Sequence, residues 1–110
     1  MIGARDWISD VKDAVFSGDR VVILAANTPR LRHLRDIVGA CVPEEALSAK
    51  KDKLIYPSGA EVHFVVASDS CLRGCGRTIG LLLLDEGWTS DIRAAARPAL
   101  REGGRIGAIV

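Results

Sequence analysis

Aromatic residues are scarce in this chain of 110 residues, in which tryptophan, tyrosine and phenylalanine together make up 5%. An excess of one charge is also absent, because 15 lysines and arginines stand against 14 aspartates and glutamates. A net charge of +1 gives no whole-molecule field that would draw the chain to nucleic acid or a membrane. Since no aromatic residues interleave with the arginines, the sequence does not predict a stacking platform for single strands.

Long apolar runs and a cysteine framework are missing as well. No apolar run reaches the roughly 18 residues that span a bilayer, and the first ten residues lack the apolar core of a signal peptide. We therefore expect a cytoplasmic protein with no membrane association. Three cysteines are too few and odd in number for a disulfide framework. Cys41, Cys71, Cys75 and His63 include the ligand types of zinc, but their spacing does not predict a zinc site or a nucleophilic cysteine.

The length fits one domain over residues 1–110. Apolar residues at helical spacing alternate with continuous apolar runs that are typical of buried strands. The predicted elements, in chain order, are a helix over 5–17, a strand over 20–27, a helix over 28–39, a short helix over 43–49, a hairpin over 53–67 that turns at 57–59, a strand over 78–87, a helix over 91–102 and a strand over 105–110. This alternation predicts an α/β fold: a small, mainly parallel sheet with flanking helices and one β-hairpin.

The segment Thr78–Trp88, TIGLLLLDEGW, runs four leucines into two acids. An apolar strand that ends in this way places Asp85 and Glu86 at the carboxyl edge of a parallel sheet, where ligands bind in open α/β folds. In phosphoryl-transfer enzymes the first acid holds Mg²⁺ and a neighbouring acid orients the attacking water. Asp85 is thus a candidate Mg²⁺ residue and Glu86 a candidate catalytic base. The alternative is a strand that ends in solvated acids.

Four segments in order resemble the RecA-like ATPase core of phage terminase large subunits, a P-loop NTPase of the ASCE class. They are RVVILAANTPRLRHLRDIV, LIYPSGAEVHFVVA, LRGCGRTIGLLLLDEG and ARPALREGGRIGAIV. The resemblance implies a reduced RecA-like fold and a bacteriophage protein in the host cytoplasm. It also implies that Asp85 is the Walker B aspartate, that Glu86 is the catalytic glutamate, and that Arg73 and Gly74 belong to the loop before that strand.

The phosphate-binding loop of that family, G-x-x-x-x-G-K-[ST], is missing. The segment GARDWISD, Gly3–Asp10, stands where it would begin, without its second glycine or its lysine. Each lost charge-assisted contact would cost roughly 1.5–3 kcal/mol of nucleotide affinity. We therefore expect no independent ATP hydrolysis, and ATP and Mg²⁺ would be cofactors only in an active ATPase. Because the strand before that loop is also missing, we expect the strand over 78–87 to pair directly with the last strand.

Three functional hypotheses follow. The first is a degenerate, non-hydrolysing terminase-like protein that acts through a protein partner or as a homo-oligomer, because open sheet edges invite pairing. The second is an Mg²⁺-dependent NTPase, or less plausibly a nuclease, that uses Asp85 and Glu86. The third is a DNA-binding accessory protein that uses two stripes of arginines. The alternative interpretation of these stripes is a solvated helix face. One stripe consists of Arg30, Arg32 and Arg35, and the other consists of Arg93, Arg97 and Arg101. Trp7 and Trp88 are expected to be core or interface anchors.

Overall fold

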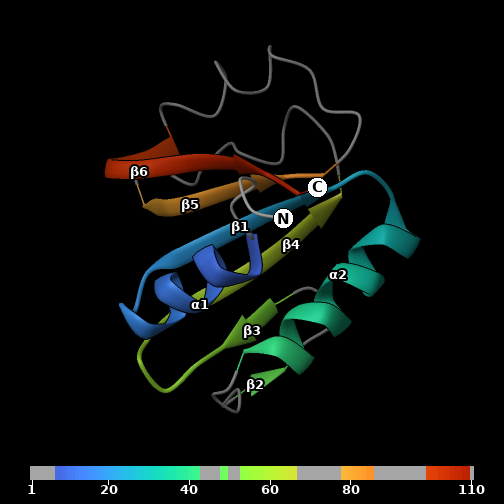
Figure 1. Ribbon diagram of the computed structural model, residues 1–110, viewed down its shortest axis with the longest axis horizontal. Helices are drawn as coiled ribbons and strands as arrows, with labels where there is room; N and C mark the ends of the chain where they lie inside the picture. Colours follow the sequence, from blue (N-terminus) through green and yellow to red (C-terminus); the bar gives the residue numbers. More distant parts are fainter. Residues whose placement is uncertain (1–6, 43–47, 50–52, 67–77, 86–98, 110) are drawn as a thin grey trace, which may run out of the picture.

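The structure, a computed structural model, describes residues 7–42, 48–49, 53–66, 78–85 and 99–109. Within these ranges, two helices cover one face of a six-stranded sheet (Figure 1). The elements, in chain order, are α1 (Trp7–Phe16), β1 (Arg20–Ala25), α2 (Thr28–Cys41), β2 (Ser48–Ala49), β3 (Lys53–Ile55), β4 (Glu61–Val66), β5 (Ile79–Leu84) and β6 (Leu100–Ala108).

The sheet is mixed but mainly parallel, with the strand order β2-β3-β4-β1-β5-β6. Strand β1 is parallel to both of its neighbours, β4 and β5, and β5 is parallel to β6. Strand β3 is antiparallel to β4 and to β2. The prediction of an α/β fold with a mainly parallel sheet and one hairpin is therefore confirmed. The expected direct pairing of the apolar strand β5 with the last strand β6 is confirmed as well.

Both helices begin and end as the sequence predicts to within a few residues. In α1 the buried side chains are mainly those at helical spacing, such as Val11 and Val15, and Gly18 follows the helix with a positive φ of 73°. Asn27 caps α2, since its Oδ1 accepts a hydrogen bond from the Arg30 N–H at 2.9 Å. Pro29 stands in the first turn of α2, where its missing N–H costs nothing.

The hairpin joins the sheet to the helical layer. The Tyr56 N–H donates to the Ala60 carbonyl at 2.9 Å, and the Gly59 N–H donates to the Tyr56 carbonyl at 3.0 Å. Gly59 has a φ of 92°, which a residue with a side chain adopts only under strain. The Ser58 hydroxyl donates to the Val15 carbonyl at the end of α1. The predicted turn at 57–59 is thus confirmed, and it is fixed against α1.

The core has two layers, one on each face of the sheet. The larger layer packs α1 and α2 against alternate residues of the strands, among them Ile23, Phe64 and Leu83. The smaller layer holds the residues in between, such as Leu24 and Leu82. Every residue of β5 is buried. A strand that is buried on both faces needs no polar alternation, and this is why the leucine run reads as continuous.

Several predicted boundaries are wrong. The helix predicted over 91–102 does not reach its stated end, because residues 100–102 begin β6, while residues 91–98 lie outside the described residues. The short helix over 43–49 is contradicted at 48–49, which form β2. Helix α2 continues two residues past Gly39, and β1 stops at Ala25 because Ala26 and Asn27 lead into the cap. The last strand begins at Leu100 rather than at 105.

Neither of the described helices has the length and apolar character that a membrane crossing requires.

Candidate functional site

Asp85 lies where the sequence predicts, directly after β5 at the carboxyl end of the parallel strands. Its side chain has no exposed surface. The Arg30 guanidinium binds both carboxylate oxygens, with Nη2 at 2.7 Å from Oδ1 and Nε at 3.0 Å from Oδ2. The Ala26 N–H also donates to Oδ2 at 3.1 Å. The carboxylate thereby ties the end of β5 to the end of β1 and to the first turn of α2.

The residues around Asp85 do not fit the Mg²⁺ that the family resemblance implies. Magnesium takes six oxygen ligands in near-octahedral geometry, and a cation beside it opposes its binding. Here the Arg30 guanidinium already engages both oxygens of Asp85. Among the described residues, no three His, Cys, Asp or Glu side chains come together as a metal site.

Among the predicted site residues that the structure describes, Arg30 is bonded to Asp85. Glu86, Arg73, Gly74, Arg93 and Arg97 lie outside the described residues.

Within α2, Arg32 is exposed and Arg35 is half-buried. Arg101 is not on a helix but in β6, near the amino end of the parallel strands. Arg30 and Arg101 therefore lie at opposite ends of the sheet, each bonded to an aspartate. The described arginines do not form one basic face.

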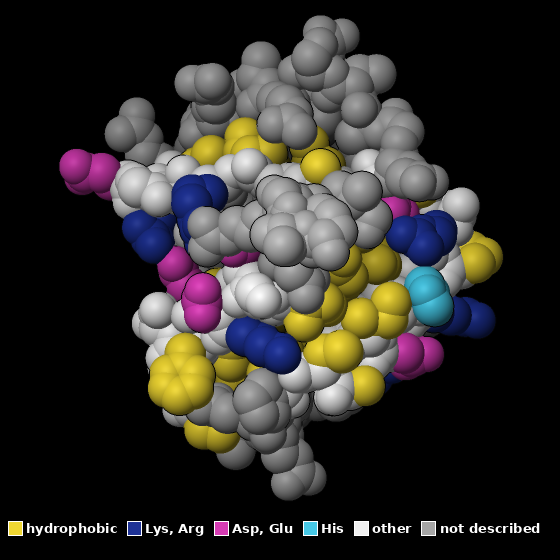
Figure 2. All heavy atoms as spheres, viewed as in Figure 1, with side chains coloured by type: hydrophobic (Ala, Val, Ile, Leu, Met, Phe, Trp, Pro, Cys, Tyr) yellow, Lys and Arg dark blue, Asp and Glu magenta, His cyan; other side chains and the backbone are white. Residues whose placement is uncertain are grey.

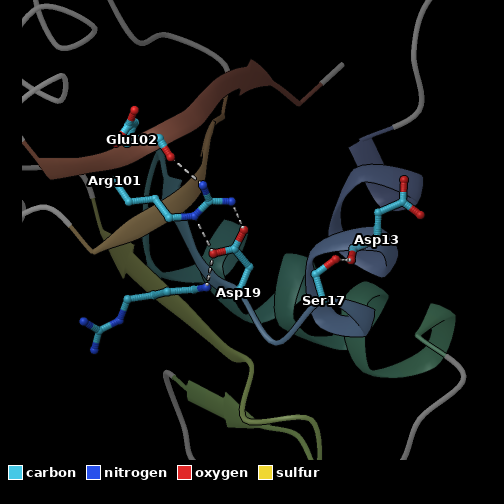
Figure 3. Close-up of polar contacts among 6 residues, drawn as sticks. Asp13, Ser17, Asp19, Arg101 and Glu102 are labelled. Atoms are coloured by element: carbon cyan, nitrogen blue, oxygen red, sulfur yellow. Dashed lines mark hydrogen bonds and ion pairs between the residues drawn. The ribbon is translucent and has the colours of Figure 1, made fainter.

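Asp19 and Arg101 make a second bidentate ion pair, which the sequence analysis missed (Figure 3). Arg101 Nε lies 2.9 Å from Asp19 Oδ1 and Nη2 lies 2.6 Å from Oδ2. Asp19 Oδ1 also accepts from the Arg20 N–H at 3.2 Å, and Arg101 Nη1 donates to the Glu102 carbonyl. The pair joins the turn between α1 and β1 to the start of β6, at the edge opposite to Asp85.

The Asp19–Arg101 pair lies against Gly80 of β5, because the Asp19 carboxyl group packs on this glycine. The ladder between β5 and β6 shifts there, because Ile79 pairs with Leu100 while Leu81 pairs with Arg105. Residues 101–104 of β6 form a bulge at this point, and Gly103 takes a φ of 79°. The Asp19 carboxyl group fills the space that a Cβ of Gly80 would need. Glycine at position 80 is thus what allows Asp19 to reach Arg101.

The ion pair shifts the pKa of both groups. The hydrogen bond from Arg101, aided by its charge, holds the pKa of Asp19 below its usual value, although partial burial acts in the opposite direction. The same hydrogen bond raises the pKa of Arg101. Both residues are therefore charged at neutral pH. Basic and acidic side chains lie side by side at the left edge of the molecule in Figure 2, where β5 and β6 begin.

His63 belongs to a polar cluster on β4. Its Nε2 lies 3.1 Å from Glu61 Oε1 and 3.4 Å from Arg20 Nη2. Burial, aided by the charges of Arg20 and Lys53, lowers the pKa of His63, although the neighbouring Glu61 acts in the opposite direction. Cys41, another of the four residues whose side chains are of a type that binds zinc, is an exposed free thiol at the end of α2. Cys71 and Cys75 lie outside the described residues.

Asp10 is a buried acid that the sequence pattern places among the polar residues of α1. Only 9% of Asp10 is exposed, although a polar position on a helix is usually solvated, and its Oδ1 lies 3.8 Å from Arg105 Nη1 on β6. Trp7, one turn earlier, packs against the main core as an anchor, as predicted, whereas Trp88 lies outside the described residues. A hollow of about 230 Å³ lies between α1 and β6, lined by Trp7, Asp10 and Arg105 among others.

No protein-family model matches the chain, and no curated protein matches it either.

Proposed function

We propose that this chain is a non-hydrolysing relative of the terminase ATPase core, with a reduced RecA-like fold. We further propose that it acts by binding another polypeptide, and that this polypeptide is a second copy of the same chain. The Arg30–Asp85 pair is the observation that carries this proposal. The resemblance implies that this aspartate serves Mg²⁺ in the family. In this chain both of its oxygens are bonded to an arginine that is fixed in the first turn of α2.

The arrangement of the sheet supports the reduced RecA-like fold. Strands β4, β1, β5 and β6 are parallel neighbours, and the fully buried strand β5 delivers Asp85 to their carboxyl edge. Ligands bind at this edge in open α/β sheets. The edge has therefore kept the position of a phosphate-chemistry site, while its acid serves to hold β1, β5 and α2 together.

The ends of the sheet support a role in association. Strand β6 stands at one end of the strand order and is nine residues long, whereas β2 at the other end has two residues. Five of the nine residues of β6 are exposed. A long edge strand presents N–H and C=O groups that can pair with another chain, and a very short one does not. Strand β6 is thus the surface best suited to such a role.

The other two hypotheses receive less support. An NTPase that uses Asp85 would first have to break a buried bidentate ion pair. A DNA-binding face would need several arginines on one side, but Arg30 and Arg101 bind aspartates at opposite ends of the sheet.

Nucleotide turnover tests the non-hydrolysing part of the proposal. ATP hydrolysis would be measured with and without Mg²⁺ for the unchanged chain and for Glu86→Gln. We expect the same background rate in all four samples, because no lysine or glycine loop grips the phosphates and Asp85 is bonded to Arg30. Mg²⁺-dependent turnover that disappears in Glu86→Gln would overturn the proposal.

A further inference from the structure

The outer edge of β6 runs beside two adjoining hollows. In the described part of the chain no strand pairs with this edge. The hollow of about 230 Å³ lies between α1 and the second half of β6, and a second hollow of about 170 Å³ lies beside the first half. Both are lined by Leu81 and Arg105. Helix α1 and strand β6 therefore leave space between them along most of the strand.

Charges of opposite sign line this space. Asp10 projects from α1 into the larger hollow, and Arg105 lies on β6 between the two hollows. Arg105 is half exposed, and its Nη1 lies 3.8 Å from Asp10 Oδ1, which is longer than a hydrogen bond. Its guanidinium is therefore within the field of Asp10 without being fixed by it. Such a surface suits an occupant that carries both charges, as a second copy of this chain does.

The pairing of β6 with β5 settles which side chains share a face. Arg105 pairs with Leu81 and Gly107 with Leu83, and both leucines belong to the core layer beneath the helices. Ile106 pairs with Leu82 and packs in the opposite layer. Arg105 and Gly107 thus lie on the helical face and Ile106 on the other face, since side chains alternate along a strand.

We propose that two copies associate by antiparallel pairing of their β6 strands, with Ile106 opposite the second copy's Ile106. A two-fold axis normal to the sheet keeps the helices of both copies on one face and pairs residues of like face. In this register Arg105 stands opposite the second copy's Gly107 and reaches that copy's Asp10 over a position with no side chain. Ile106 and its counterpart form an apolar pair on the other face.

The neighbouring registers are less favourable. A shift that centres the axis on Arg105 places two arginines directly opposite each other, and like charges in that position destabilise a sheet. A shift toward the start of β6 enters the bulge over 101–104, where the ladder is interrupted. The regular stretch of β6 that pairs with β5 is Arg105–Ala108, and the proposed axis lies within it.

This inference rests on the proposed function and names the surface that the self-association uses. Sedimentation velocity at tens of micromolar would compare the unchanged chain with Ile106→Lys and Arg105→Glu. We expect a dimer for the unchanged chain and a dimer at least tenfold weaker for each variant. Ile106→Lys places two lysines at the axis, and Arg105→Glu places a carboxylate beside the second copy's Asp10. Arg105→Lys, which keeps the charge, should retain most of the dimer.

Phe16→Lys is the matched control, because Phe16 is the most exposed large hydrophobic residue described, at 77% exposure, and lies on α1 rather than on β6. We expect it to dimerise like the unchanged chain. Circular dichroism would confirm folding, and Arg105→Glu at an exposed position keeps the test valid if Ile106→Lys unfolds. A dimer that survives both β6 variants, or that Phe16→Lys abolishes, overturns this surface while self-association stands. A monomeric unchanged chain overturns both.

Discussion

At the scale of single residues, the ion pairs Asp85–Arg30 and Asp19–Arg101 differ in how far they are buried. The Asp85 side chain is fully buried and its partner Arg30 is 38% exposed, whereas Asp19 and Arg101 are both partly exposed. A buried carboxylate depends on its counter-charge more than a solvated one does, because water cannot replace the lost partner. The two pairs should therefore respond differently to substitution and to pH.

We predict that Arg30→Gln destabilises the fold more than Asp85→Asn. Arg30→Gln leaves a buried carboxylate without its arginine and should cost about 3 kcal/mol of unfolding free energy. Asp85→Asn removes the buried charge itself, and Arg30 can turn toward water, so the cost should be about 1–2 kcal/mol. Urea unfolding measures both, with the exposed neighbour Arg32→Gln as the control. Equal effects of Arg30→Gln and Arg32→Gln would contradict the structural role of the pair.

We predict that Asp19→Asn lowers the melting temperature at neutral pH but not in strong acid. Because the pKa of Asp19 is lower in the folded chain than in the unfolded chain, its ionised form stabilises the fold above about pH 4. This stabilisation is lost as the pH falls through the depressed folded pKa. Thermal unfolding from pH 7 to pH 2 should show the melting temperatures of Asp19→Asn and the unchanged chain converging. A constant difference across this range would refute the prediction.

The sequence predicts the position of Asp85 but not its partner. An apolar run followed by acids indicates a strand end, which is a local property. Arg30 lies 55 residues earlier, so its contact with Asp85 depends on the strand order β1-β5 and on the start of α2. The burial of Asp10 was missed for the same reason, because the helical pattern of α1 contains no information about Arg105 on β6.

At the scale of elements, β6 shows why a helical pattern can fail. The fourfold spacing of arginines up to Arg101 indicates a helix, but Leu100 pairs with Ile79 at the start of β6. Gly103 and Gly104, which directly follow the predicted helix over 91–102, lie in the bulge within β6. Glycines mark helix ends and strand bulges equally well, so the pairing partner decides between them.

We predict that Gly80→Ala destabilises the fold chiefly through Asp19. The added methyl group would occupy the space of the Asp19 carboxyl group, and such overpacking typically costs about 1–3 kcal/mol. In an Asp19→Ala background the same substitution should cost clearly less, because the obstructing group is gone. Urea unfolding of the two single variants and the double variant measures this coupling.

Gly39→Ala is the control for the Gly80 substitution. Gly39 lies in α2, and no atom comes within 4 Å of a Cβ added there. Since alanine stabilises a helix more than glycine does, Gly39→Ala should stabilise the fold by about 0.5–1 kcal/mol.

The Gly80 prediction would be contradicted by additive effects of Gly80→Ala and Asp19→Ala on the free energy of unfolding. Additivity would show that Asp19 does not occupy the space over Gly80.

At the scale of the whole molecule, alternating helices and apolar runs were enough to predict a mainly parallel α/β sheet. Connections between parallel strands are long, and this leaves few ways to arrange β1, β4, β5 and β6. The two-residue strand β2 was not predicted, because so short a strand has no periodicity of its own. The resulting sheet has one long edge at β6, where we propose that two copies associate.

Sedimentation velocity of the unchanged chain at tens of micromolar tests the central claim most directly. We predict a species of twice the 11.8 kDa mass of one chain, whose proportion falls on dilution. A species of 11.8 kDa throughout this concentration range would contradict self-association through β6.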